Sequence, residues 1–135
     1  MNPANLAKDS EHSHQVALFA WCAYNVGKYP ELEWYHAIKN EEKSGSVILG
    51  GKAKAAGIKT GVSDTFLPVK RGEFSGLYIE LKKPSVKPVK ATSKGGVSDD
   101  QRKFGAFVQS QGFGFAVCYG WEEARDMLIK YLQYS

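Results

Sequence analysis

Of all the segments in the sequence, Leu77 to Pro84, LYIELKKP, most constrains the fold of this chain. It has the composition of a strand but carries an acid, Glu80, and a base, Lys82, in its middle. Successive side chains of a strand point to opposite faces, so the three aliphatic residues share one face while Glu80 and Lys82 share the other. The aliphatic and aromatic content predicts an interior strand, where a charged pair is costly unless it has partners. The run therefore predicts a sheet with one apolar face and one polar, potentially functional, face.

A second acid, Asp64, begins the strand-like run that precedes this one in DTFLPVKRGEFSGLYIELKK. The glycines between the two runs predict a hairpin, and Pro68 predicts that its first strand is bulged or marginal. Neighbouring antiparallel positions lie about 4.5–5.5 Å apart, so Asp64 and Glu80 can share a hard cation such as Mg²⁺. Lys82 would then place an ammonium beside a water or a scissile phosphate. An ordinary salt bridge between Glu80 and Lys82 on a solvated face is the alternative.

The bulk properties predict one globular domain over residues 1–135, in which residues 1–9 are flexible. Apolar residues make up 43% of the chain and charged residues 24%, as in soluble proteins. No apolar run is long enough for a membrane span and no secretory signal is recognisable, so we expect a cytoplasmic protein with no membrane partner. Cys22 and Cys118 stand in apolar surroundings and are expected to be buried thiols.

The first half of the chain gives one clear helix signal and two weaker signals. Residues 10–26 predict a helix with Ser10 as its N-cap and Gly27 as its stop. Residues 33–40, EWYHAIKN, predict a short strand. Residues 45–57, GSVILGGKAKAAG, are ambiguous between a helix and a loop rich in glycine and lysine, and we favour the helix.

The second half is easier to interpret. Residues 84–97 hold prolines and lysines without apolar periodicity and predict a mobile basic loop. Ser98 and Gln101 have the spacing of a capping box and predict the start of a helix that ends at Gly112. A short apolar strand over 113–120 and a last helix with acids in its first turn complete the chain. This order predicts an α/β fold with a mixed sheet flanked by helices.

Histidines and tryptophans add little chemistry of their own. None of the histidines has the spacing of a metal site; we expect His36 in the core or near the site, and His12 and His14 on the surface. The tryptophans are expected to be core aromatics; they are Trp21, Trp34 and Trp121.

Positive charge is concentrated in the middle of the chain. The net charge is +4, and residues 39–94 contain twelve Lys or Arg against five acids. Phosphate contact is the natural hypothesis for cations that flank the carboxylates, although solvated lysines that only maintain solubility are the alternative. The predicted DNA-binding residues are Lys39, Asn40, Lys52, Lys54, Lys59, Arg71, Lys83, Lys87, Lys90 and Lys94. No base-reading helix is apparent, so we expect recognition of backbone and shape.

The motifs SEHSHQVALFAW, WYHAIKN, AAGIKTGVSDTFLPV, GLYIELKK and SDDQRKFGAFVQSQGFGFAVCYGWEEARDMLIKYL together resemble a known family. They are similar to the virus-type replication-repair nuclease (VRR-NUC) domain of the PD-(D/E)XK superfamily, in its small, often phage-encoded standalone form. The resemblance runs from about Ser10 to Tyr134 and implies the restriction-endonuclease-like α/β fold. This chain has Ser63 before Asp64 where relatives usually have proline, and "HAIKNEE" where they often have His-Ala-Ile-Pro-Asn-Gly.

The resemblance also implies a site. Asp64, Glu80 and the main-chain carbonyl of Leu81 would hold Mg²⁺, with Mn²⁺ able to substitute, and Glu11 would be a further acidic contributor. Lys82 would act as catalytic base or charge stabiliser. Gln101 would assist at the site in addition to, or instead of, its capping role, and Gln15 would have a supporting role.

The function implied is hydrolysis of phosphodiester bonds in branched or structured DNA by a metal-dependent endonuclease. Relatives of this kind are similar to Holliday-junction resolvases, which act as homodimers, and would work in the cytoplasm of a bacterial host if phage-encoded. The alternatives are a catalytically silent DNA-binding or assembly subunit of the same fold, and a nuclease that acts on linear duplex or flap DNA.

Overall fold

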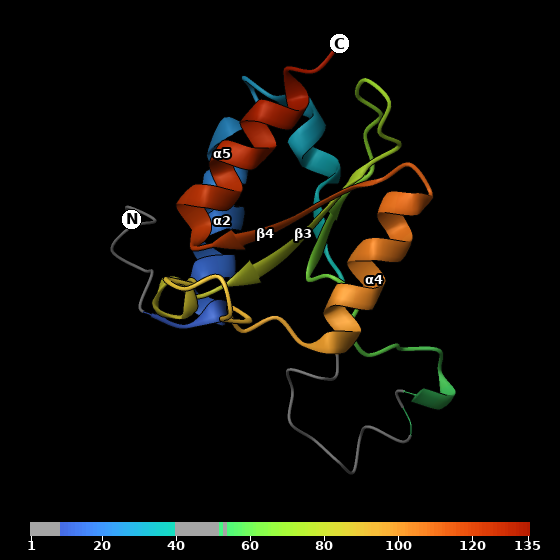
Figure 1. The fold of residues 1–135 in the computed structure, drawn as a ribbon. Coiled ribbons are helices and arrows are strands. Elements are labelled where there is room, and N and C mark those ends of the chain that lie inside the picture. Colours follow the sequence, from blue (N-terminus) through green and yellow to red (C-terminus); the bar gives the residue numbers. More distant parts are fainter. Residues whose placement is uncertain (1–8, 40–51, 53) are drawn as a thin grey trace.

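The structure is a computed structural model, and it describes residues 9–39, 52 and 54–135. In chain order its elements are α2 (Glu11–Asn25), η1 (Pro30–Trp34), β1 (His36–Ala37), β2 (Thr65–Leu67), β3 (Leu77–Lys82), η3 (Pro84–Val86), α4 (Asp99–Ser110), β4 (Gly114–Tyr119) and α5 (Trp121–Leu132). Helices pack on both faces of a central sheet (Figure 1). The predicted α/β architecture is therefore confirmed.

The sheet is mixed and has the strand order β1-β2-β3-β4. The first three strands are antiparallel neighbours, which confirms the predicted hairpin, and β4 runs parallel to β3. Thr65 pairs with Ile79, so one step further along this register brings Asp64 opposite Glu80. β2 ends at Leu67, directly before Pro68, because proline cannot donate the next hydrogen bond of the ladder.

The two faces of the sheet are covered by different helices. α2 and α5 pack against each other and against β3 on one face, where the aliphatic side chains of β3 are buried. On the other face α4 covers the sheet: Phe104 contacts Tyr78 edge to face, and Gln101 reaches Glu80. The alternation predicted for β3 is thus present, with its charged residues on the α4 side.

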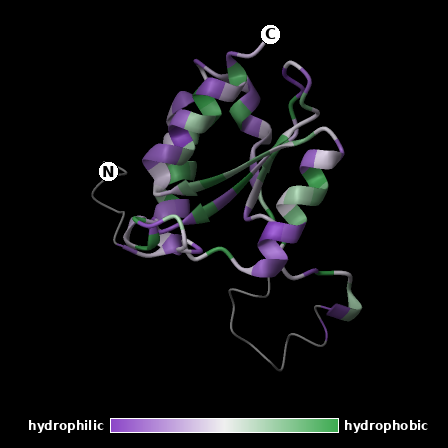
Figure 2. Cartoon of the chain, viewed as in Figure 1, coloured by the Kyte–Doolittle hydropathy of each residue, from purple (hydrophilic) through white to green (hydrophobic). Residues whose placement is uncertain are grey.

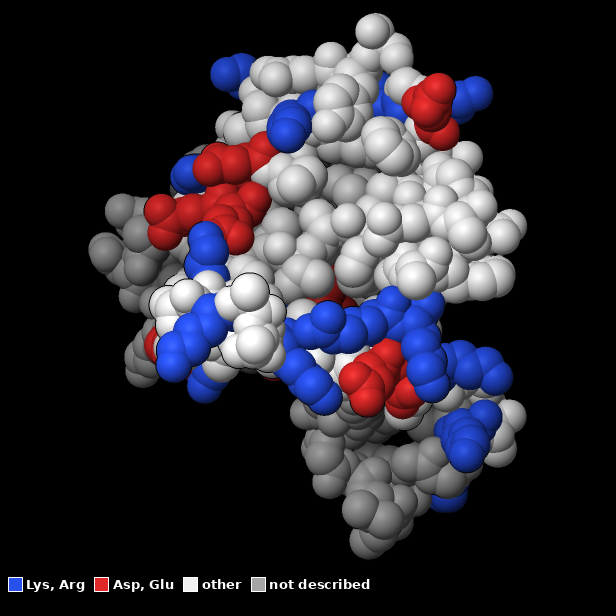
Figure 3. All heavy atoms as spheres, viewed as in Figure 1, with Lys and Arg blue, Asp and Glu red and all other residues white. Residues whose placement is uncertain are grey.

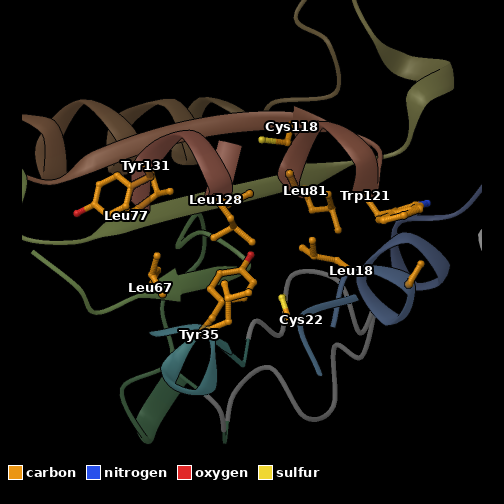
Figure 4. Close-up of a cluster of buried hydrophobic side chains, with 14 residues drawn as sticks. Leu18, Cys22, Tyr35, Leu67, Leu77, Leu81, Cys118, Trp121, Leu128 and Tyr131 are labelled. Carbon is orange, nitrogen blue, oxygen red and sulfur yellow. The ribbon is translucent and has the colours of Figure 1, made fainter. Parts of the chain in front are cut away.

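The apolar core lies between the sheet and the α2–α5 layer (Figure 4). Leu18, Leu81 and Trp121 lie together there. The hydropathy colouring of Figure 2 shows apolar residues in the strands at the centre of the fold. Cys22 and Cys118 are buried free thiols, as expected, and burial raises the pKa of each to about 12. In the described part of the chain no helix is long and apolar enough to span a membrane.

The predicted helix ends are confirmed where capping residues signalled them. The Ser10 side chain accepts a hydrogen bond from the main-chain N–H of Ser13 at the start of α2. Ser98 and Gln101 form the reciprocal capping box at the start of α4. Both caps satisfy amide groups that a helix cannot satisfy itself.

Several predictions for residues 33–57 need correction or lie outside the description. Residues 33–34 belong to η1, because Pro30 opens a 3-10 turn, and the strand shrinks to two residues. Trp34 is 67% exposed and is not a core residue. Most of the segment predicted as a helix over 45–57 lies outside the described residues; within it, Ala56 N–H donates to the Lys52 carbonyl as in a helical turn. The prediction for residues 1–9 falls almost entirely outside the description.

The loop that leads into β2 packs against the start of α4. Gly61 has φ +84, and a Cβ there would lie 2.6 Å from the main chain of Asp100. Thr60 donates a hydrogen bond to the Asp100 carboxylate at 3.1 Å. Only glycine can come this close to the Asp100 main chain. The loop is therefore held against the start of α4 at Gly61, two residues before the buried pair Ser63 and Asp64.

This contact predicts a specific cost for Gly61→Ala. The substitution should lower the free energy of unfolding by about 2–4 kcal/mol, because it adds overpacking to a left-handed backbone conformation. Gly57→Ala is the matched control, since Gly57 has φ +92 with no atom within 4 Å of a Cβ, and should cost only about 1–2 kcal/mol. Urea unfolding measures both values, and equal losses would contradict the proposed close approach.

Candidate functional site

Three carboxylates from three separate segments converge at one end of the sheet. One oxygen each from Glu11, Asp64 and Glu80 lies within 4.8 Å of the other two. Glu11 is the first residue of α2, Asp64 directly precedes β2, and Glu80 is in the middle of β3. Asp64 is 4% exposed and Glu80 is fully buried, so these are interior acids and not a solvated surface cluster.

Asp64 is held from both sides by main-chain groups. Its carboxylate accepts a hydrogen bond from Leu81 N–H at 2.7 Å, and its carbonyl accepts one from Ile38 N–H at 2.7 Å. The first bond ties Asp64 to β3 and the second ties it to the end of β1. The carboxylate is therefore oriented by the sheet itself.

A buried hydroxyl pair fixes the register of β2 against β3. Thr65 Oγ1 donates to the carbonyl of Ile79 at 3.1 Å and lies 2.5 Å from the Tyr35 hydroxyl. Because the threonine proton is used on Ile79, the tyrosine donates. Burial raises the pKa of Tyr35 well above its ordinary value, so the phenol keeps that proton. The strands that carry Asp64 and Glu80 are thereby locked to each other.

Lys82 is the cation of the cluster. Its Nζ lies 3.5 Å from Glu80 Oε1 and 3.6 Å from Glu11 Oε1, and the residue is 6% exposed. The alternative of a solvated salt bridge on the sheet face is therefore excluded, because the pair lies in the interior. Lys82 instead faces the point where the carboxylates meet.

Gln101 makes both the capping contact and a contact with the carboxylate cluster. Its Oε1 accepts the N–H of Ser98 at 2.9 Å to complete the capping box, while its Nε2 donates to Glu80 Oε1 at 2.9 Å. The amide has two chemically different ends, so the cap fixes which end points to the carboxylate. The start of α4 thus orients Glu80.

The charges of the cluster fit a divalent cation. The cluster holds three acidic side chains and one basic side chain in a small space, and repulsion between like charges is strong at such separations in a low dielectric. Clustered carboxylate oxygens are also the donor type that Mg²⁺ prefers. Asp64, Glu80 and Glu11 are consequently the side chains that could hold such an ion, and the Leu81 carbonyl stays a predicted fourth ligand.

Two neighbouring positions have less defined roles. Gln15 is half-buried on α2, one turn after Glu11, and its supporting role stays a prediction. The Ser63 hydroxyl is fully buried, and among the described residues it has no hydrogen-bond partner. Serine at this position therefore adds a buried polar atom, and nothing in the structure explains it.

Most of the predicted DNA-binding cations are exposed. Figure 3 shows Lys and Arg gathered over the loop after β3 and around the start of α4, with the acidic first turn of α4 between them. The exposed members of the predicted set are Lys39, Lys52, Lys54, Lys59, Lys87, Lys90 and Lys94, while Lys83 is half-buried. Asn40 lies outside the described residues. Phosphate contact by these groups stays a prediction.

Some cations of the set have partners within the chain, among them Arg71 and Lys87. Arg71 forms an ion pair with Glu31 and donates to the Leu132 carbonyl at 3.3 Å, at the end of α5. The structure thus uses Arg71 to join η1 to α5, and its contact with DNA phosphate stays a prediction. Lys87 pairs with Glu123 at 2.5 Å but is exposed.

The histidine predictions have different outcomes. His14 is 6% exposed, so its predicted surface position was wrong, whereas His12 is on the surface as expected. His36 is exposed, which excludes the core alternative and leaves its place near the site a prediction. His14 Nδ1 accepts the N–H of Trp121, which lies 107 positions later in the chain. Local sequence contains no signal for such a contact, and it contains none for the Tyr35–Thr65 pair either.

The mixed sheet, its flanking helices and the carboxylates at one end define an α/β protein of the PD-(D/E)XK nuclease class. The family model of the VRR-NUC domain matches residues 8–122, most of the chain, so this chain belongs to the VRR-NUC family of nuclease domains, whose substrate is DNA. A search of curated proteins found no match. A solved structure described as "VRR_NUC domain protein" has the same fold, with a TM-score of 0.72 and 20% identity over 96% of this chain and 93% of that chain.

The charge balance of the cluster makes a testable prediction for Asp64→Asn. Removing one of three crowded charges should raise the metal-free melting temperature by about 3 °C, the shift expected from about 1 kcal/mol in a domain of this size. The same change should abolish the rise in melting temperature that Mg²⁺ or Mn²⁺ produces in the unmodified protein. Asp126→Asn, an exposed acid on α5, is the control. Equal stabilisation of all three proteins by the ion would contradict a metal site at Asp64.

Proposed function

We propose that this protein is a Mg²⁺-dependent DNA endonuclease that hydrolyses phosphodiester bonds in branched or structured DNA, with Mn²⁺ able to replace Mg²⁺. The observation that carries the proposal is the convergence of Glu11, Asp64 and Glu80 within 4.8 Å, with Lys82 at 3.5–3.6 Å from two of them. A degenerate, catalytically silent copy of the fold would be free to lose these groups. Their joint presence in one buried cluster therefore favours an enzyme over a silent DNA-binding or assembly subunit.

Each residue has a role that follows from its position. Asp64 and Glu80, with Glu11 and the Leu81 carbonyl, would hold the cation, which when bound supplies Lewis acidity to water and phosphate. Lys82 would donate hydrogen bonds to a phosphate oxygen and stabilise the negative charge of the transition state. Gln101 keeps Glu80 in one orientation through its 2.9 Å hydrogen bond. Side chains held rigidly around the cation in this way would lower the barrier, because little reorganisation is needed during the reaction.

Substrate preference is the finer part of the proposal. The exposed lysines named above offer phosphate contacts on the loop after β3 and on the segment before β2. Such contacts position a duplex but carry no sequence information. Contacts of this kind are therefore better suited to read DNA shape than a short sequence.

A cleavage panel tests this proposal. With Mg²⁺, purified protein should cut a four-way junction faster than a flap or the matching linear duplex. Lys82→Gln should lower the cleavage rate by about 100-fold or more, the usual loss when a transition-state donor is removed. Lys130→Ala changes an exposed lysine at the end of α5 and is the control. Equal rates on all substrates would refute structure selectivity, and no cleavage with either metal would support the silent-subunit alternative.

We also propose that the active form is a homodimer that forms through the outer edge of β4. β4 is the last strand of the sheet order, and no described strand pairs with its outer side. Residues 104–121 contain no Asp, Glu, Lys or Arg, and Figure 3 shows an uncharged area over β4 and the C-terminal half of α4. Hollows of about 340 and 330 Å³ flank this strand, and Gln109 and Phe115 line both. Edge strands without charge or proline are normally covered.

Light scattering tests the dimer. The unmodified protein should have twice the mass of the 14.9 kDa chain. Ala106→Glu should convert it to the monomer, because a two-fold axis would bring two like charges together beside β4. Val89→Glu, at a loop position that is 95% exposed, should leave the dimer intact. A monomeric unmodified protein, or an unchanged mass after Ala106→Glu, would contradict this interface.

A further inference from the structure

His14 connects two helices beside the carboxylate cluster. It lies in the first turns of α2, three positions after Glu11, and is 6% exposed. Its Nδ1 accepts the main-chain N–H of Trp121, the first residue of α5, at 3.0 Å. An Nδ1 that accepts an N–H uses its lone pair for this bond, so the ring proton lies on Nε2. His14 therefore acts as the N-cap that Gly120, which lacks a side chain, cannot supply to α5.

The main-chain amide of Gly120, directly before Trp121, is hydrogen-bonded to β3. Gly120 N–H donates to the main-chain carbonyl of Lys82 at 2.8 Å. Two consecutive amides at the start of α5 are thus shared between α2, through the His14 ring, and β3, through Lys82. The Lys82 ammonium then returns to α2, because its Nζ lies 3.6 Å from Glu11 Oε1.

These contacts form a closed ring that runs from Glu11 to Lys82, to the Gly120–Trp121 junction, and back through His14 to α2. Within the cluster, Glu11 is the carboxylate that comes from a helix. Asp64 and Glu80 are placed by the strands, whereas Glu11 is placed by the first turn of a helix, and helix ends fray. The caps of Ser10 bond within α2 and cannot fix the helix against the sheet. His14, three positions after Glu11, forms a hydrogen bond that links α2 to α5.

We propose that His14 is a positioning residue that holds Glu11 at the metal site by anchoring the start of α2 to the Gly120–Trp121 junction. The proposal rests on the metal site proposed above and adds a residue to its support. Groups that orient a ligand without touching the metal typically contribute 10- to 100-fold in metal affinity. A cap with no role beyond the stability of α5 would leave that affinity unchanged in the folded protein.

Two substitutions separate these roles. His14→Leu introduces an apolar side chain of similar size and removes the Nδ1 acceptor. His14→Asn instead places an amide oxygen, Oδ1, where Nδ1 lies, so an acceptor is retained. Calorimetric titration of the apoprotein with Mn²⁺, well below the melting temperature of each variant, should show about tenfold weaker binding for His14→Leu. His14→Asn should bind within about threefold of the unmodified protein. His12→Leu, at an exposed position of the same helix, is the control and should bind normally.

A double-mutant cycle tests whether the effect acts through Glu11. Glu11→Gln should itself weaken Mn²⁺ binding, and His14→Leu added to it should cause no further loss, since the carboxylate it positions is gone. If His14→Leu folds poorly, His14→Gln supplies the second variant, because its amide reaches beyond the position of Nδ1 and should bind Mn²⁺ as weakly as expected for leucine.

The outcomes distinguish this inference from the function it rests on. Failure of the unmodified protein to bind Mn²⁺ would overturn both the proposed metal site and the role of His14. Normal Mn²⁺ binding by folded His14→Leu, or an equal loss with and without Glu11→Gln, would overturn only the role of His14. Rescue by His14→Asn together with a null effect in the Glu11→Gln background would support it.

Discussion

The hydrogen bond from Leu81 N–H to the Asp64 carboxylate is the interaction on which the site depends. At 2.7 Å and buried, it replaces the main-chain bond that would continue the β2–β3 ladder, so the ladder ends with a side chain as acceptor. The Asp64 carbonyl still binds the next strand through Ile38 N–H. A carboxylate fixed in this way has one oxygen committed to the sheet, and the sheet determines how it meets Glu80.

Gln101 and Lys82 stabilise the second acid, Glu80, beside Asp64. Glu80 is fully buried, and it is tolerated because Gln101 donates to it and the Lys82 ammonium lies 3.5 Å away. Removing one partner of a buried ion pair generally costs about 3–5 kcal/mol, so Glu80 and Lys82 depend on each other. The members of the cluster come from α2, the loop before β2, β3 and α4. The cluster therefore forms only when the whole fold does.

Much of this arrangement could be predicted because it depends on local rules. Strand alternation placed Glu80 and Lys82 opposite the aliphatic side chains of β3, and the capping box of Ser98 and Gln101 located the start of α4. The turn glycines indicated the hairpin that brings Asp64 to Glu80. Each signal is contained within a few residues, where steric and hydrogen-bonding preferences act directly.

One error concerns a residue whose partner is distant in sequence: His14 is buried because the start of α5 approaches it. Another concerns Trp34, which is exposed because Pro30 turns the chain locally before a strand can form. Arg71 also has a distant partner, Glu31, 40 positions away, that no local pattern signals. Histidine, arginine and tryptophan are amphipathic, so composition alone does not decide whether they face the core or water. Tertiary contacts decide their positions.

Gln101 shows why a capping role and a site role need not be alternatives. The carbonyl end of the amide serves the helix and the N–H end serves Glu80, so one rotamer satisfies both. The cap also removes the freedom of the amide to flip, which would otherwise present an acceptor to a carboxylate. Helix initiation and carboxylate orientation are thereby coupled, and neither can change without the other. The ring through His14 extends the same logic to α2: hydrogen bonds that begin helices also aim the charged groups at the end of the sheet.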